Sequence, residues 1–308
     1  MKRRQTGMAE AGLQGRIWGI DPSLPSMQRR RIDFFSRCTV PKPVFFALVL
    51  IFLIVAVSLL APLVTPYGRD TIDLDHILTG PSPQHILGTD ELGRDLLTRL
   101  IFGGRFTLLV AFVSVAIATV IGLTLGTLAG YIGGFADHLV SGAVDLFLSI
   151  PVFLVLLLAA SFSGGRLWTI PLIIGATSWM ETARLVRAEF LSLKGEEFVE
   201  AARSMGVNAV SLIFKHMLPH ALSPVIVAAT VGFAQAMLIE SALSFLGYGV
   251  QPPLPTWGNM LQNAQIFLRK TPLAAFAPGF MICITCLCIH YVSEGLRYAL
   301  GHRGHETV

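Results

Sequence analysis

Hydrophobic residues in this chain fall into long uncharged runs separated by short polar segments. Runs long enough to cross about 30 Å of hydrocarbon begin near Pro43, Phe106, Leu139, Ala221 and Thr271. One further run, residues 167–180, is short for a span, and we include it because its helix can continue through residues 181–187 beyond the bilayer. The pattern predicts an all-α polytopic membrane protein with six transmembrane helices.

Composition and charge agree with a membrane protein. The chain is 53% hydrophobic and only 14% charged, which excludes an ordinary soluble domain. Of its 23 Lys and Arg residues, sixteen lie in residues 1–42, in residues 181–220 or after Tyr291. The positive-inside rule therefore places both termini and residues 181–220 in the cytoplasm. We expect a multi-pass protein of the plasma or inner membrane that contacts lipid and no nucleic acid.

These runs also divide the chain into segments. We expect a basic cytoplasmic tail (1–42), a first transmembrane helix that is retained (43–65), an external loop with an interfacial helix (66–105), a core of five transmembrane helices (106–300) and a cytoplasmic tail (301–308). Thr89 or Asp90 is expected to cap the interfacial helix. A stripe of small residues predicts close helix packing in the second span. The stripe consists of Thr119, Gly122, Gly126 and Gly130.

Residues 195–219 form a charged segment with helical periodicity. An apolar face repeats at the spacing of one short helix, through Phe198, Ala201, Ala202 and Met205. Gly206 stands where a left-handed helix end is expected, and Asn208 can cap a second short helix. We expect Pro219 to end that second helix, and Pro224 to open the fifth span.

Glu200-Ala201-Ala202, then Gly206 and Leu218-Pro219, resemble the EAA signature of permease subunits of bacterial ABC importers. The sequence LGTDELGRD at residues 87–95 resembles the N-terminal signature of the second permease type of dipeptide and oligopeptide importers. Residues 238–261 resemble the same importer family, and the histidine at position 216 resembles its peptide-importer branch. The resemblance implies a type I ABC importer permease fold with a cytoplasmic coupling helix. It also implies that the following residues contact an ATPase: Phe198, Glu200, Ala201, Ala202, Met205 and Gly206.

Several partners and a substrate class follow from this resemblance. It implies a heterodimer with a homologous second permease, two ABC ATPase subunits and an extracytoplasmic substrate-binding protein. The expected cargo is a di- or oligopeptide, while nickel, glutathione or another small solute remains an alternative within the same family.

Three common catalytic and nucleotide-binding motifs are absent from the sequence. No lysine follows a glycine as a Walker A motif requires, and neither Gly-x-Ser-x-Gly nor His-Glu-x-x-His occurs. We therefore expect no enzyme activity and no cofactor in this subunit, with ATP bound by the partner ATPases. His216 with His220, and the cysteines at 283, 286 and 288, are weak metal candidates, so we expect no metal site.

Two carboxylates fall within the apolar runs. Asp145 lies in the third run and Glu240 near the outer end of the fifth. Charged groups at membrane depth are candidates for a translocation path, although each can equally serve helix packing. If both carry protons or cations, the chain would instead be an ion-coupled secondary transporter.

Overall fold

The computed structural model describes residues 41–301, so the two predicted tails lie almost entirely outside the described part. The regular elements of residues 41–301 are all helical, apart from one isolated bridge between Thr89 and Asp95. The elements are α2 (Lys42–Leu59), α3 (Ala61–Val64), η2 (Leu74–His76), α4 (Leu96–Ile132), α5 (Gly134–Ser149), α6 (Val152–Ser163), α7 (Thr169–Thr177), α8 (Trp179–Leu193), α9 (Glu197–Ser204), α10 (Ala209–Ser211), η3 (Leu212–Met217, a π-helix), α11 (Leu218–Phe245), α12 (Trp257–Ala264), η4 (Gln265–Phe267) and α13 (Leu273–Gly301).

Four of the described helices are long and apolar enough to span a membrane. They are α2, α4, the continuous stretch Ala209–Phe245 and α13, and they correspond to the first, second, fifth and sixth predicted spans. The third span is a pair, α5 and α6, bent by 83° at Pro151 and counted as a fifth span if the pair crosses as one. The fourth was expected as one helix, which is wrong, because a break at Ser178 divides it into α7 and α8.

The expected interfacial helix is not a separate element. α4 begins at Leu96 and runs for 37 residues, which is about 55 Å at the helical rise and well beyond the hydrocarbon thickness. Its N-cap is Asp95, whose carboxylate accepts the Thr98 N–H at 2.7 Å, so the predicted caps Thr89 and Asp90 are wrong. Thr89 instead pairs with Asp95 in the bridge, and Asp90 accepts from Arg94.

The small-residue stripe of α4 is confirmed as a packing face. α4 lies along α8, and a Cβ added at Gly122, Gly126 or Gly130 would stand 2.6 Å from an atom of α8. These glycines therefore allow an approach between the two helices that larger residues would prevent. α11 and α7 pack on α4 as well.

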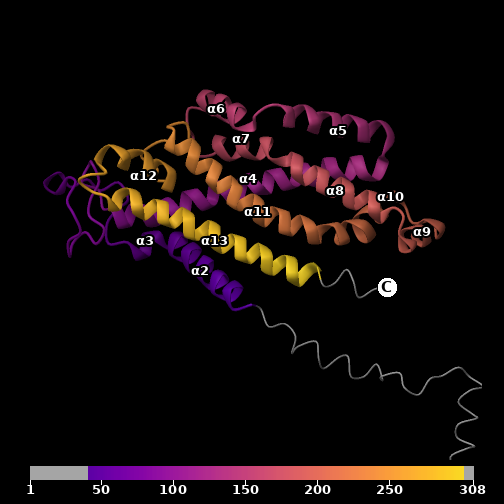
Figure 1. Cartoon of the computed structure of the whole chain (residues 1–308), viewed down its shortest axis with the longest axis horizontal. Helices are drawn as coiled ribbons and strands as arrows, with labels where there is room; N and C mark the ends of the chain where they lie inside the picture. The colour runs from indigo at the N-terminus through magenta and orange to yellow at the C-terminus, as the bar shows by residue number, and fades with distance from the viewer. Residues whose placement is uncertain (1–40, 302–308) are drawn as a thin grey trace, which may run out of the picture. The chain divides into compact units, whose positions relative to one another are not determined.

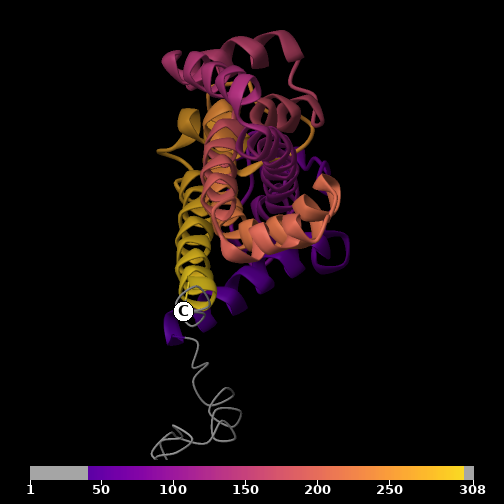
Figure 2. The same cartoon turned by 90° about the vertical axis from the view of Figure 1, so that its right-hand side faces the viewer.

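The two ends of the helix bundle carry different structures (Figure 1). α9 and α10 lie at one end, while α12 and the loop that precedes α4 lie at the other. α5 and α6 lie on one side of the bundle and α2 on the opposite side (Figure 2). Large apolar side chains are exposed on these outer helices, among them Phe46, Phe52, Phe135 and Phe162. Such surfaces suit lipid or another membrane subunit.

Candidate functional site

The short helix α9 is held against the rest of the chain by one face. Val199 and Ala202 are buried in a core cluster. Their partners in that cluster come from α8, η3 and α11, and are Val186, Phe190, Leu212, Met217, Ala221 and Val225. α9 is therefore a fixed platform rather than a free helix.

The opposite face of α9 is open. Phe198 is 37% exposed and Met205 76% exposed, and Ala201 and Glu200 are exposed as well. Ala202 differs from the expectation, because its side chain is 2% exposed and lies in the chain's own core. The exposed apolar residues Phe198, Ala201 and Met205 follow the spacing i, i+3, i+7. Val199 and Ala202 form the separate face that packs inward.

Gly206 ends α9 as expected from its position. Its φ is +78°, and the two hydrogen bonds of a Schellman motif are present. The Gly206 N–H donates to the Arg203 carbonyl at 2.9 Å, and the Val207 N–H donates to that of Ala202 at 3.1 Å. Asn208 then caps the next helix by accepting the Ser211 N–H at 2.7 Å. The predicted glycine joint is confirmed.

The predicted end of the second helix is wrong. α10, the π-helix η3 and α11 are continuous, and Pro219 lies in the first turn of α11. Proline is tolerated there, since the preceding π-turn already changes the hydrogen-bond register. Pro224 likewise lies inside α11 and does not open it.

Two exposed residues beside α9 were not among the predicted contacts. Val210 and Phe214 are exposed, whereas Met217, three residues further, is buried. Their apolar spacing was visible in the sequence, but periodicity alone does not say which side of a helix faces outward. We call the exposed apolar residues at this end of the bundle the α9 surface, and they are Phe198, Ala201, Met205, Val210 and Phe214.

Glu240 is fully buried and its carboxylate is surrounded by hydroxyl groups. Ser244 Oγ donates to Glu240 Oε1 at 2.7 Å, and Ser241 Oγ lies 3.5 Å from Glu240 Oε2. The side chains of Thr107 and Thr256 also lie near the carboxylate, and their hydroxyl oxygens accept the backbone N–H groups of Trp257 and Asn259 respectively. Glu240 thus lies where α4, α11 and the start of α12 meet.

We expect Glu240→Ala to destabilise the chain by about 2–4 kcal/mol, because it leaves a cavity and buried hydroxyls without an acceptor. Glu240→Gln keeps an acceptor oxygen, so it should lower the stability of the chain much less. Thermal unfolding of the detergent-solubilised chain measures both. A Glu240→Gln variant of unchanged stability that had lost uptake would instead support ion coupling at this residue.

Asp145 is an exposed partner of α8 rather than an isolated charge. Its Oδ1 accepts from Arg184 Nη2 at 2.6 Å, and both side chains are more than half exposed. One turn of α8 further, Arg187 donates to Asp137. These two ion pairs join α5 to α8, and an exposed pair of this kind contributes little stability by itself.

A cavity of about 80 Å³ lies between α4, α7, α8 and α11. Neither Asp145 nor Glu240 lines it, so the structure does not bring the two predicted path residues together. Its polar lining residues are Ser114, Thr119, Ser178, Glu181, Thr182 and Gln235. Of these, only Thr119 was singled out from the sequence, and only as a packing residue, since isolated polar residues carry no strong signal.

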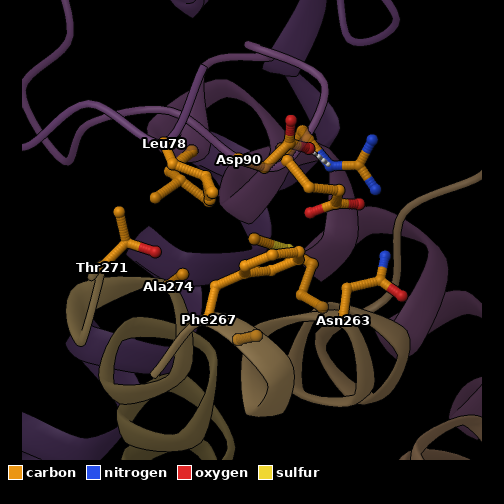
Figure 3. Close-up of a pocket in the computed structure, with 11 residues that line it drawn as sticks. Leu78, Asp90, Asn263, Phe267, Thr271 and Ala274 are labelled. Atoms are coloured by element: carbon orange, nitrogen blue, oxygen red, sulfur yellow. Dashed lines mark ion pairs between the residues drawn. The ribbon is translucent and has the colours of Figure 1, made fainter. Parts of the chain in front are cut away.

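A second cavity, of about 20 Å³, lies at the other end of the bundle. Leu78 and Asp90 face Asn263, Phe267, Thr271 and Ala274 across it (Figure 3). Asp90 pairs there with Arg94 at 2.7 Å and with Arg99 at 3.4 Å. This volume suits about one water molecule rather than a substrate.

Comparison with known proteins agrees with this architecture. Residues 122–303 match the family described as "Binding-protein-dependent transport system inner membrane component". The dipeptide transport system permease protein DppC of Alkalihalophilus pseudofirmus is 37% identical over 87% of this chain and 88% of its own length. The oligopeptide transport system permease protein OppC of Haemophilus influenzae is 35% identical over 88% of this chain and 86% of its own length.

The fold has a counterpart among solved structures. A chain of the MetNI methionine ABC transporter in an inward-facing conformation superposes with a TM-score of 0.55 at 24% identity, covering 67% of this chain and 97% of that one. The match shows the permease fold of a type I ABC importer, and a transport permease is not an enzyme class. This multi-pass membrane chain therefore belongs to the family of binding-protein-dependent transport system inner membrane components.

Proposed function

We propose that this chain is the second-type permease subunit of an ABC importer that carries di- or oligopeptides across the cytoplasmic membrane. The observation that carries the proposal is the α9 platform, which is buried on one face and open on the other. Relatives whose names specify dipeptides and oligopeptides support the substrate class.

The α9 surface suits a partner with an apolar groove. Helix-in-groove recognition uses apolar anchors at helical spacing, which Phe198, Ala201 and Met205 supply. The exposed Glu200 adds a charged contact at the edge. We assign this surface to an ABC ATPase subunit, with both chain termini on the same cytoplasmic side. Because Val199 and Ala202 tie α9 to α8 and α11, movement of the ATPase would be passed directly to these helices.

The remaining partners follow from the same proposal. A homologous permease would cover the exposed apolar helices, and an extracytoplasmic binding protein would deliver the peptide at the α12 end. ATP would bind to two partner ATPases and favour the outward-facing state by binding it more tightly. The cavity between α4, α7, α8 and α11 is the proposed segment of the translocation path, since its hydroxyl and amide groups can satisfy a peptide backbone.

Met205→Glu tests the proposed docking surface. The substitution should lower ATPase co-purification and uptake of a labelled dipeptide on the order of tenfold. The reason is that it replaces an apolar interface residue by a carboxylate, which must give up its hydration when the partner binds. Met205 is exposed, so the fold itself should not change. Met205→Leu, which keeps an apolar side chain, is the matched control. Normal ATPase binding and uptake by Met205→Glu would exclude this surface as the dock.

A further inference from the structure

Three potential metal ligands meet in the loop that precedes α4. One ligand atom each from Asp73, His76 and His85 lies within 4.8 Å of the other two. His85 is 5% exposed, while the side chains of Asp73 and His76 are partly exposed. His85 is therefore held inside the protein, while Asp73 and His76 leave the cluster accessible to solvent.

The hydrogen bonds of His85 orient it as a ligand. Its Nδ1 lies 3.0 Å from Asp95 Oδ1, so Nδ1–H donates to that carboxylate and the free lone pair is on Nε2. A carboxylate behind an imidazole in this way fixes the tautomer and raises its basicity toward a metal. The other oxygen of Asp95 caps α4 through the Thr98 N–H. His85 is thus joined to the first turn of α4.

The backbone around the other two ligands is also fixed. Gly93, with a φ of +74°, lies so close to Asp73 that an added Cβ would be 1.7 Å from its carbonyl oxygen. Thr89 Oγ1 donates to the carbonyl of His76, and the rings of Tyr67 and His85 stack with centroids 5.0 Å apart. His76 Nδ1 is 2.9 Å from Asp73 Oδ2. The three groups are brought together before any ion arrives.

We propose that Asp73, His76 and His85 bind one divalent ion of the zinc class, with a further position open to water or to an external ligand. Two imidazoles and one carboxylate are a ligand set typical of zinc sites that keep an open position. Calcium and magnesium are excluded because they prefer all-oxygen ligands. The ion joins η2 to the start of α4 through His85 and Asp95. This inference does not depend on the transported substrate or on the α9 surface.

The test is Zn²⁺ titration of the full-length chain, purified without a histidine tag and stripped with a chelator. Calorimetry and metal analysis should give one ion per chain that His76→Gln and Asp73→Asn weaken at least tenfold. Saturating Zn²⁺ should raise the melting temperature of the wild type more than that of either variant. His138→Gln is the matched control, because His138 is exposed on α5, far in sequence from the cluster, and its ring hydrogen-bonds to the Gly134 carbonyl.

Melting curves in chelator establish that each variant is folded before the titrations are compared. Cobalt substitution gives an independent signature, since Co²⁺ in a site with two histidines produces a visible absorption band that His85→Gln should remove. The proposal is overturned if the folded wild type shows no saturable binding. It is also overturned if His76→Gln and Asp73→Asn bind with wild-type affinity, or if His138→Gln weakens binding equally.

Discussion

Replacing Gly206 with proline is expected to abolish uptake while the membrane-spanning helices stay assembled. Gly206 has a φ of +78°, whereas proline is restricted to a φ of about −65°. Proline also lacks the N–H that donates to the Arg203 carbonyl at 2.9 Å. The hydrogen bonds that end α9 would be lost, and the residues of the α9 surface would no longer hold their relative positions. Dipeptide uptake in cells and ATPase co-purification measure the effect.

Gly206→Asn is the matched control for this substitution. Asparagine adopts the left-handed conformation more readily than other residues, and an added Cβ at this position meets nothing within 4 Å. Gly206→Asn should therefore keep most of the uptake. Membrane levels and melting temperatures establish that both variants are folded. Wild-type uptake by Gly206→Pro would contradict the role given to α9.

Gly126→Ala is expected to destabilise the packing of α4 on α8. The new Cβ would stand 2.6 Å from the Ala183 carbonyl oxygen and 2.7 Å from Val186 Cβ, and a backbone atom cannot move aside as a side chain can. Overpacking of this kind costs roughly 1–3 kcal/mol. The melting temperature of the chain in detergent should fall accordingly.

Gly142→Ala is the control, because here alanine is not expected to lower the stability of the chain. Gly142 also lies inside a helix, α5, but an added Cβ meets nothing within 4 Å. Alanine should then leave stability unchanged or increase it by up to about 1 kcal/mol, because it favours helix more than glycine does. Equal destabilisation by both substitutions would show that the close approach of α4 and α8 at Gly126 does not cause the loss of stability.

Much of this architecture follows from local sequence signals. Long apolar runs predict the four long helices because a span needs only length and hydrophobicity. The positions of Gly206 and Asn208 predict the end of α9 and the start of α10, since each conformation is set by a single residue type. The small residues of α4 likewise predict its packing face. The residue pattern of 195–219, together with its family resemblance, located the candidate docking helix.

Other features depend on contacts that no local pattern contains. Thr89, Asp90 and Asp95 are all acceptable helix caps, and the bridge between Thr89 and Asp95 decides among them. Pro219 lies within a continuous helix because a π-turn precedes it. The cluster that we propose as a metal site was not singled out from the sequence, because Asp73, His76 and His85 are spread along a loop without a motif spacing. Burial of Ala202 rather than Ala201 depends on where α8 and α11 pack.

Affinity purification of the tagged full-length chain from mild detergent, followed by mass spectrometry, tests the central claim most directly. The account predicts that a homologous permease and ABC ATPase subunits are recovered with the chain, and that Met205→Glu reduces the ATPases while leaving the second permease in place. Recovery of the chain without ATPases, from cells in which ATPase homologues are expressed, would contradict it.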